Sequence, residues 1–140
     1  MWVKIILFLL LGICAVFDSI RQEIPLAVVW TGIALAVIWH LWSGTGEMTW
    51  AAAMLSVLPG ILFWGISFVT GEKVGYGDGW LLVMIGLYTG LGKCFIILMT
   101  GLMLESAVVL VLLAVRRIST DRTVPFAPFL LLGMGVTVWL

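Results

Sequence analysis

Residues 94–115 read CFIILMTGLMLESAVVLVLLAV, an apolar run whose one charged residue is Glu105. A helix needs about 20 predominantly apolar residues to cross the hydrocarbon core of a bilayer, so this run predicts a transmembrane helix. Polar connections separate it from five further apolar runs, at residues 2–17, 24–42, 50–69, 80–91 and 124–140. The sequence therefore predicts an all-α membrane protein, a polytopic bundle of about six transmembrane helices.

The composition agrees with a bilayer environment. Of the 140 residues, 64% are hydrophobic and 10% are charged, whereas soluble domains average roughly 45–50% and about 25%. Six spans use nearly the whole length, so we expect one transmembrane domain over residues 1–140 and no soluble domain. Seven Lys and Arg balance seven Asp and Glu, which argues against nucleic acid as a partner. Two Cys and one His do not make a zinc constellation, and we expect no metal and no cofactor.

The basic residues predict the orientation of the bundle. Successive connections must alternate between the two sides of the membrane, and cytoplasmic connections carry an excess of Lys and Arg. The second and fourth connections hold only Lys93, whereas the first, third and fifth hold Arg21, Lys73, Arg116, Arg117 and Arg122. We therefore expect the first, third and fifth connections to be cytoplasmic and both termini to lie outside.

Two aspartates stand at the predicted cytoplasmic side. Asp18 and Asp78 each lie at the end of a span, and two spans separate them. Since two crossings return a chain to the side it left, both carboxyl groups are predicted to lie at the same membrane depth. Two carboxyl groups close together share one proton, so that one activates water and the other protonates a carbonyl. The alternative is that each aspartate is only a solvated residue beside a helix end.

The neighbours of the two aspartates favour the catalytic interpretation. Asp78 lies among Gly75, Gly77 and Gly79, and glycines permit unusual backbone angles and close approach of a peptide; a tight turn is the plainer reading. Asp18 is followed by Ile24-Pro25, where Pro25 is well placed to begin the next helix. Pro125 and Pro128, in the stretch Pro-Phe-Ala-Pro-Phe at 125–129, break regularity where the last span begins.

With these three motifs in this order, the sequence resembles the bacterial type IV prepilin peptidases, which belong to the GxGD class of intramembrane aspartic proteases. The resemblance implies a multi-pass protein of the bacterial inner membrane that cleaves the basic leader of prepilins or pseudopilins on the cytoplasmic side. It assigns Asp18 and Asp78 as the catalytic pair, with Gly75, Gly77, Gly79, Pro25, Pro125 and Pro128 in supporting motifs.

The chain also departs from the pattern of that family. Many relatives have Asn after Ile-Pro and Lys two residues after the motif aspartate, whereas this chain has Leu26 and Trp80 there. Larger members carry a four-cysteine zinc region and N-methylate the new pilin terminus. This chain has neither those cysteines nor that length, so it resembles a short, core-only form, and we expect no methyltransferase activity.

Two other functional classes compete with the peptidase interpretation. Val74 to Asp78 spell the core of a potassium-channel selectivity filter, in which backbone carbonyls replace the hydration shell of the ion. Lys73 precedes it where a cation would pass, and residues 50–69 are long enough to cross the bilayer, which both argue against a re-entrant pore. The other alternative is a non-enzymatic membrane scaffold of a pilus or secretion assembly.

The remaining acidic residues suggest subsidiary roles. Helix dipoles favour a carboxylate at a helix start and a protonated acid at a helix end, which predicts Asp78 as the base and Asp18 as the acid. Glu105 lies within a span, where an acid is costly and is by default a functional candidate; we expect a structural role as a hydrogen-bonding group. The acids expected to attract a basic leader are Glu23, Glu72 and Asp121.

Overall fold

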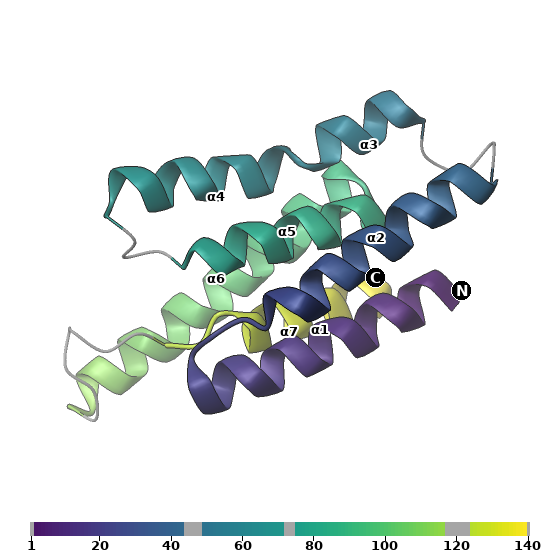
Figure 1. Cartoon of the computed structure of the whole chain (residues 1–140). Coiled ribbons are helices and arrows are strands. Elements are labelled where there is room, and N and C mark those ends of the chain that lie inside the picture. The colour runs from purple at the N-terminus through teal and green to yellow at the C-terminus, as the bar shows by residue number, and fades with distance from the viewer. Residues whose placement is uncertain (1, 44–48, 72–74, 117–123, 140) are drawn as a thin grey trace.

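A computed structural model describes residues 2–43, 49–71, 75–116 and 124–139. Its elements are seven α-helices: α1 (Trp2–Arg21), α2 (Leu26–Ser43), α3 (Trp50–Ser56), α4 (Leu58–Val69), α5 (Tyr76–Thr89), α6 (Leu91–Ala114) and α7 (Ala127–Trp139). Within these described ranges there is no β-strand, which confirms the predicted all-α class. The helices lie side by side as a bundle (Figure 1).

The predicted span at residues 50–69 is broken into α3 and α4, which meet at Val57. Pro59 lies in the first turn of α4, and proline has no backbone N–H and crowds the carbonyl four residues earlier. The third span is therefore interrupted, a feature that the apolar pattern alone did not predict. If α3 and α4 are counted as one interrupted helix, the described residues form six helical segments, which we call rods.

Four of the six rods are long and apolar enough to cross a membrane: α1, α2, α3 with α4, and α6. The two others, α5 with 14 residues and α7 with 13, rise only about 20 Å at 1.5 Å per residue. Both pack between longer helices: α5 contacts the five helices α1 to α4 and α6, and α7 contacts α1 and α6. Each of the two short helices therefore lies against longer ones.

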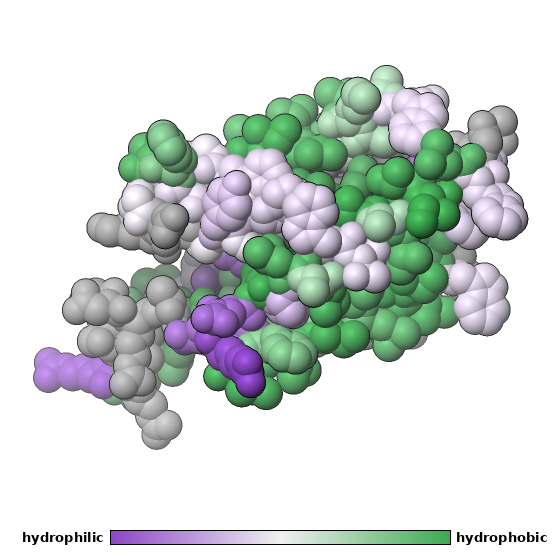
Figure 2. Space-filling view, viewed as in Figure 1, coloured by the Kyte–Doolittle hydropathy of each residue, from purple (hydrophilic) through white to green (hydrophobic). Residues whose placement is uncertain are grey.

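The ends of the rods alternate as the sequence predicts. The helices α1, α4 and α6 end, and α2, α5 and α7 begin, at one end of the bundle, whereas α1 begins and α7 ends toward the other (Figure 1). Strongly hydrophilic side chains gather at the first of these ends, whereas apolar side chains cover the flank of the molecule (Figure 2). We call this the junction end; that it faces the cytoplasm remains a prediction.

The core lies around α5, where residues 81–86 are all buried. Glycines allow helices to approach closely in a membrane protein, and a methyl group added at Gly86 of α5 would collide with the backbone oxygen of Ser56 in α3. At the end opposite the junctions, the Tyr88 hydroxyl donates to the Gly32 carbonyl at 2.9 Å, which ties α5 to α2. The largest fully buried side chains of the core include Leu7, Leu11, Val29, Leu81, Leu82, Met84, Ile85, Ile97, Leu130 and Met134.

Several predicted helix boundaries were wrong by a few residues. The fourth helix begins at Tyr76 rather than at Trp80, so Asp78 lies inside its first turn. The first helix continues to Arg21, so Asp18 lies inside its last turn rather than after it. The chain turns between α5 and α6 at Gly90, which has a φ of 82°, rather than at residues 92–93. The two cysteines, Cys14 and Cys94, are free and buried.

Candidate active site

Asp18 is a buried carboxyl group in the last turn of α1, with 6% of its surface exposed. Its Oδ2 accepts a hydrogen bond of 2.9 Å from the backbone N–H of Ala127, which is 109 residues away and is the first residue of α7. The backbone N–H of Phe126 is directed at the same carboxyl group. Asp18 therefore caps the beginning of α7, although it belongs to a different helix.

The two prolines around Ala127 explain why this N–H is available. The first N–H groups of any helix have no partner within that helix. Pro128 contributes no N–H at all, and the N–H groups of Phe129 and Leu130 both bond to the Phe126 carbonyl, at 3.0 and 3.2 Å. Ala127 therefore holds the unpaired donor of the first turn, and Asp18 satisfies it.

Asp78 lies in the first turn of α5, with Gly75 as the residue that caps the helix. The Asp78 N–H donates to the Gly75 carbonyl at 3.1 Å. The Asp78 side chain folds back over the same residue, because a methyl group added at Gly75 would lie 2.8 Å from Asp78 Oδ2. Gly75 thus makes room for the carboxyl group itself.

The other two glycines of this turn also make room for side chains. A methyl group at Gly77 would lie 3.0 Å from Cβ of Ile24, and one at Gly79 would collide with the indole ring of Trp64. Gly75 has an ordinary φ of −60°, and positive φ among the described glycines occurs only at Gly71 and Gly90. Close approach is therefore the reason for the three glycines, and unusual backbone angles are not.

The structure brings Asp18, Asp78 and Glu105 within electrostatic reach of one another. The charge of Asp18 acts on both Asp78 and Glu105, and the charge of Glu105 acts on Asp78. The placement of Glu105 follows from α6: Gly101, one turn earlier on the same face, packs against Leu130 of α7, so Glu105 faces the beginning of α7. Both aspartates therefore lie at the same end of the bundle, and their common depth in a membrane stays a prediction.

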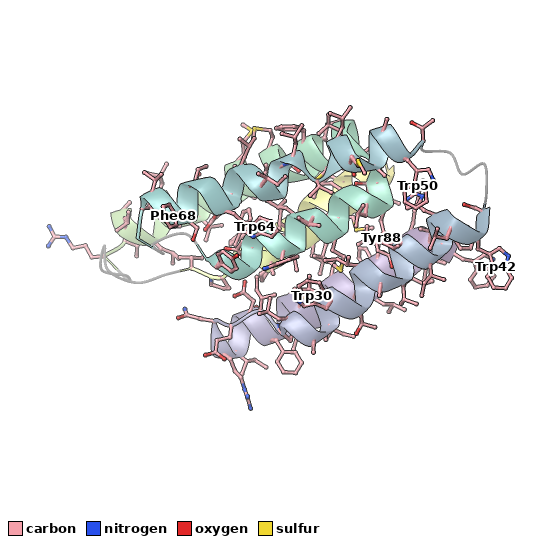
Figure 3. The ribbon with its side chains drawn as sticks, turned by 45° about the horizontal axis from the view of Figure 1, so that its top comes forward. Trp30, Trp42, Trp50, Trp64, Phe68 and Tyr88 are labelled. Carbon is pink, nitrogen blue, oxygen red and sulfur yellow. The ribbon has the colours of Figure 1, made fainter. Side chains whose placement is uncertain are left out.

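Aromatic rings from α2, α4 and α5 cluster around the beginning of α5. Trp30 lies 4.4 Å from Trp80, Trp80 lies 4.4 Å from Trp64, and Trp64 stacks on Tyr76 at 5.9 Å, as centroid distances. Trp30 and Trp64 lie on opposite sides of the beginning of α5 (Figure 3). Sequence reasoning missed this cluster; its signal was that Trp30 and Trp64 fall far from the span ends, where membrane tryptophans usually lie.

The indole Nε1 of Trp64 is a buried donor that has no hydrogen-bond partner within the described part of the chain. Buried polar groups of this kind are rare and each has a cost of about 1–3 kcal/mol. The residue before Trp64 in α4 is Phe63, and its ring stacks on the ring of Phe126 with a centroid distance of 5.8 Å. Side chains from α4 and the stretch before α7 thus meet beside the aspartates.

The supporting motif residues also lie at the junction end. Pro25 precedes α2, and its carbonyl accepts from the N–H groups of Val28 and Val29 at 2.9 and 3.3 Å, so it opens the helix as predicted. Among the described residues, no group of three His, Cys, Asp or Glu side chains is arranged to hold a metal ion. Other predicted residues lie outside the described ranges: Glu72, Lys73, Val74, Arg117, Asp121 and Arg122.

The selectivity-filter interpretation does not agree with the backbone. From Tyr76 onward the chain is helical, so the carbonyl groups of Tyr76 and Gly77 point along a helix rather than into a pore. A filter needs carbonyls arranged in a ring around an ion. The structure therefore argues against a channel at this motif.

Comparison with known proteins finds a distant homologue. Over 128 residues the chain is 28% identical to a protein of Pseudomonas putida named prepilin leader peptidase/N-methyltransferase. The similarity covers 89% of this chain and 44% of that relative, so the chain spans less than half of the relative's length. No family model matches the sequence. No solved structure matches it either.

Proposed function

Because the chain is a distant homologue of a prepilin leader peptidase, as its three motifs predicted, we propose that it is an intramembrane aspartic endopeptidase. The proposed substrates are prepilin-like or pseudopilin proteins, cut after their basic leader at the cytoplasmic face of the bacterial inner membrane. Asp18 and Asp78 are the proposed catalytic pair. Methyl transfer is not part of the proposal.

One observation carries the proposal: residues of all three motifs meet around two carboxyl groups. Ile24 packs on Gly77, and Ala127 donates to Asp18, while the charge of Asp18 acts on Asp78. A pair of carboxyl groups that share one proton is the chemistry of aspartic proteases. A scaffold would give no reason for placing a buried acid and a half-buried acid within electrostatic reach of each other in a membrane bundle, where acids are costly.

The experiment is cleavage of a prepilin-like peptide by the protein purified in detergent. Asp18→Asn and Asp78→Asn are expected to abolish cleavage, because an amide can neither accept the proton of water nor donate one as an acid. Glu23→Gln removes a carboxyl group from an exposed position near the junction end and is the matched control. We expect it to alter the apparent KM at most, since Glu23 is proposed only to attract the basic leader.

The outcomes separate the candidate functions. Retained cleavage in either aspartate variant, with thermal unfolding unchanged, rejects the catalytic pair. No cleavage by the wild type, with the peptide bound, favours the non-enzymatic scaffold. Unchanged KM in Glu23→Gln removes Glu23 from leader recognition and leaves the peptidase proposal in place.

A further inference from the structure

Asp18 and Asp78 lie in unequal surroundings, although both are carboxyl groups at one end of the bundle. Asp18 is buried and is held by a backbone N–H at the beginning of α7. The side chain of Asp78 folds back over the first turn of its own helix. Between described residues, the Asp78 carboxyl group makes no hydrogen bond. Reasoning from each aspartate's own helix predicted Asp78 as the base, because it did not include α7.

The beginning of α7 changes that comparison. An N–H donor bonded to a carboxylate favours the ionised form, and the partial positive charge at the start of a helix acts in the same direction. Asp18 lies at the C-terminal end of α1, which acts against ionisation, but the hydrogen bond to Ala127 is direct and buried. A direct hydrogen bond to a charged group contributes more free energy than a helix dipole does. The contact with α7 therefore determines which form of Asp18 is favoured, and that is the ionised form.

We propose that the Ala127 N–H is a positioning group that makes Asp18 the ionised member of the pair, and therefore the base that activates water. This rests on the proposed function. Asp78 is then the acid, carrying the shared proton. The Pro-Phe-Ala-Pro-Phe stretch has a role in this scheme, since it directs the N–H groups of Ala127 and Phe126 at one carboxylate.

The proposed step is balanced in atoms and protons. The Asp18 carboxylate takes a proton from water as the water oxygen bonds to the scissile carbonyl carbon, while Asp78 gives its proton to the carbonyl oxygen. The resulting gem-diol collapses when Asp18 gives its proton to the leaving nitrogen and the C–N bond breaks. Asp78 recovers a proton from a gem-diol hydroxyl. The pair ends as it began, with Asp18 ionised and Asp78 protonated.

Other titratable groups face Asp18 from the helices packed around it. In α1 these are Cys14, one turn earlier, and Arg21 in the last turn. Asp78 lies in α5 and Glu105 in α6, both within electrostatic reach. α7 carries no titratable side chain between Ala127 and Trp139. The influence of α7 on Asp18 is therefore that of its backbone.

Ala127→Pro tests this directly, because it removes the N–H that bonds to Asp18 at 2.9 Å and leaves the Phe126 N–H in place. Proline is well accepted at the first position of a helix, so α7 is expected to form. The expected result is that the acidic limb of the pH profile of kcat/KM moves up by about one pH unit, a tenfold change in the ionisation of the base. Ala127→Gly keeps the N–H, loses the methyl group, and is expected to keep the acidic limb of the wild type.

A second variant guards against misfolding of Ala127→Pro. Replacing the amide of residue 127 by an ester, through incorporation of lactic acid, removes the same N–H without adding a ring. The proposal requires the same upward movement of the acidic limb in the ester variant. An acidic limb that stays in place in the folded ester variant overturns it.

Infrared titration of 13C-labelled aspartate provides a readout that does not need substrate. The carboxylate band of Asp18, identified by its loss in Asp18→Asn, is expected to appear at lower pH than the band of Asp78. Ionisation of Asp78 first overturns the inference, even if the protein is a peptidase. Conversely, Asp18 ionising first in a protein that cleaves nothing supports the inference and rejects the proposed function.

Discussion

The contact between Gly79 and Trp64 allows the most exact test of how the candidate site is held. In Gly79→Ala, the new methyl group would collide with the indole ring of Trp64 and lie 3.2 Å from the Gly60 carbonyl oxygen. Trp64 has little room to move away, because Tyr76 stacks on one side and Trp80 meets it edge-on at 4.4 Å. We expect the beginning of α5 to be displaced from α4.

The magnitude follows from two opposing effects. Inserting a methyl group into a packed core costs typically about 1–3 kcal/mol. Replacing glycine by alanine within a helix stabilises the helix by about 1 kcal/mol. The net loss of stability is therefore roughly 0–2 kcal/mol. The effect on cleavage is expected to be larger, since Asp78 is the adjacent residue and a displacement of about 1 Å can cost a hundredfold in rate.

The assay compares Gly79→Ala with Gly65→Ala in purified protein. Gly65 is the neighbour of Trp64 in α4, and nothing lies within 4 Å of a methyl group added there, so this control is expected to gain stability. Unfolding is followed by circular dichroism and cleavage with the prepilin-like peptide. In a double variant, Trp64→Val is expected to restore part of the cleavage lost in Gly79→Ala. Equal cleavage by the two alanine variants, or no coupling in the double variant, would refute the reasoning.

Four further outcomes are expected. The rate of cleavage should be bell-shaped in pH, because a pair that shares one proton is active only while it holds that proton; a rate that only rises with pH contradicts this. Glu105→Gln removes a like charge beside the pair and should move the alkaline limb to lower pH; an unmoved limb would mean that Glu105 carries no charge. Gly86→Ala should unfold more readily than Gly92→Ala, since its methyl group collides with the Ser56 backbone, whereas Gly92 has free space; thermal midpoints compare them. Tyr88→Phe loses one hydrogen bond and should lose about 0.5–1.5 kcal/mol of stability, measured by the same unfolding assay.

Sequence reasoning was most successful where one physical requirement dominates. A bilayer demands long apolar runs, and four of the six predicted spans correspond to rods that can cross it. Counting the membrane crossings between Asp18 and Asp78 was enough to predict that they lie at the same end of the bundle. Neither inference needs knowledge of which side chains touch.

The helix boundaries near the aspartates were harder to predict because tertiary contacts override local preference. Three glycines in five residues disfavour a helix, yet α5 begins at Tyr76. Ile24 and Trp64 pack directly on Gly77 and Gly79. Packing on neighbouring helices therefore offsets the low intrinsic propensity of this turn.

The hydrogen bond between Asp18 and Ala127 could not be predicted from either residue alone. It joins positions 109 residues apart, and it involves a backbone N–H, which every residue except proline possesses. The available signal was Pro128, which removes the next donor of the helix and leaves the N–H groups of Phe126 and Ala127 directed at the carboxyl group. Recognising that signal requires knowing which acid lies opposite the helix.

The same contacts explain why the motifs are informative together although each is weak alone. An Ile-Pro pair, a glycine-flanked aspartate and a Pro-Phe-Ala-Pro-Phe stretch each have ordinary structural explanations. In this fold, however, Ile24 needs a residue without a side chain at 77, and the donor at 127 needs an acceptor at 18. A change in one motif therefore loses a contact made by another. Such mutual requirements are satisfied by chance far less often than any single motif, which is why the order of the three motifs predicts a site that no one of them predicts alone.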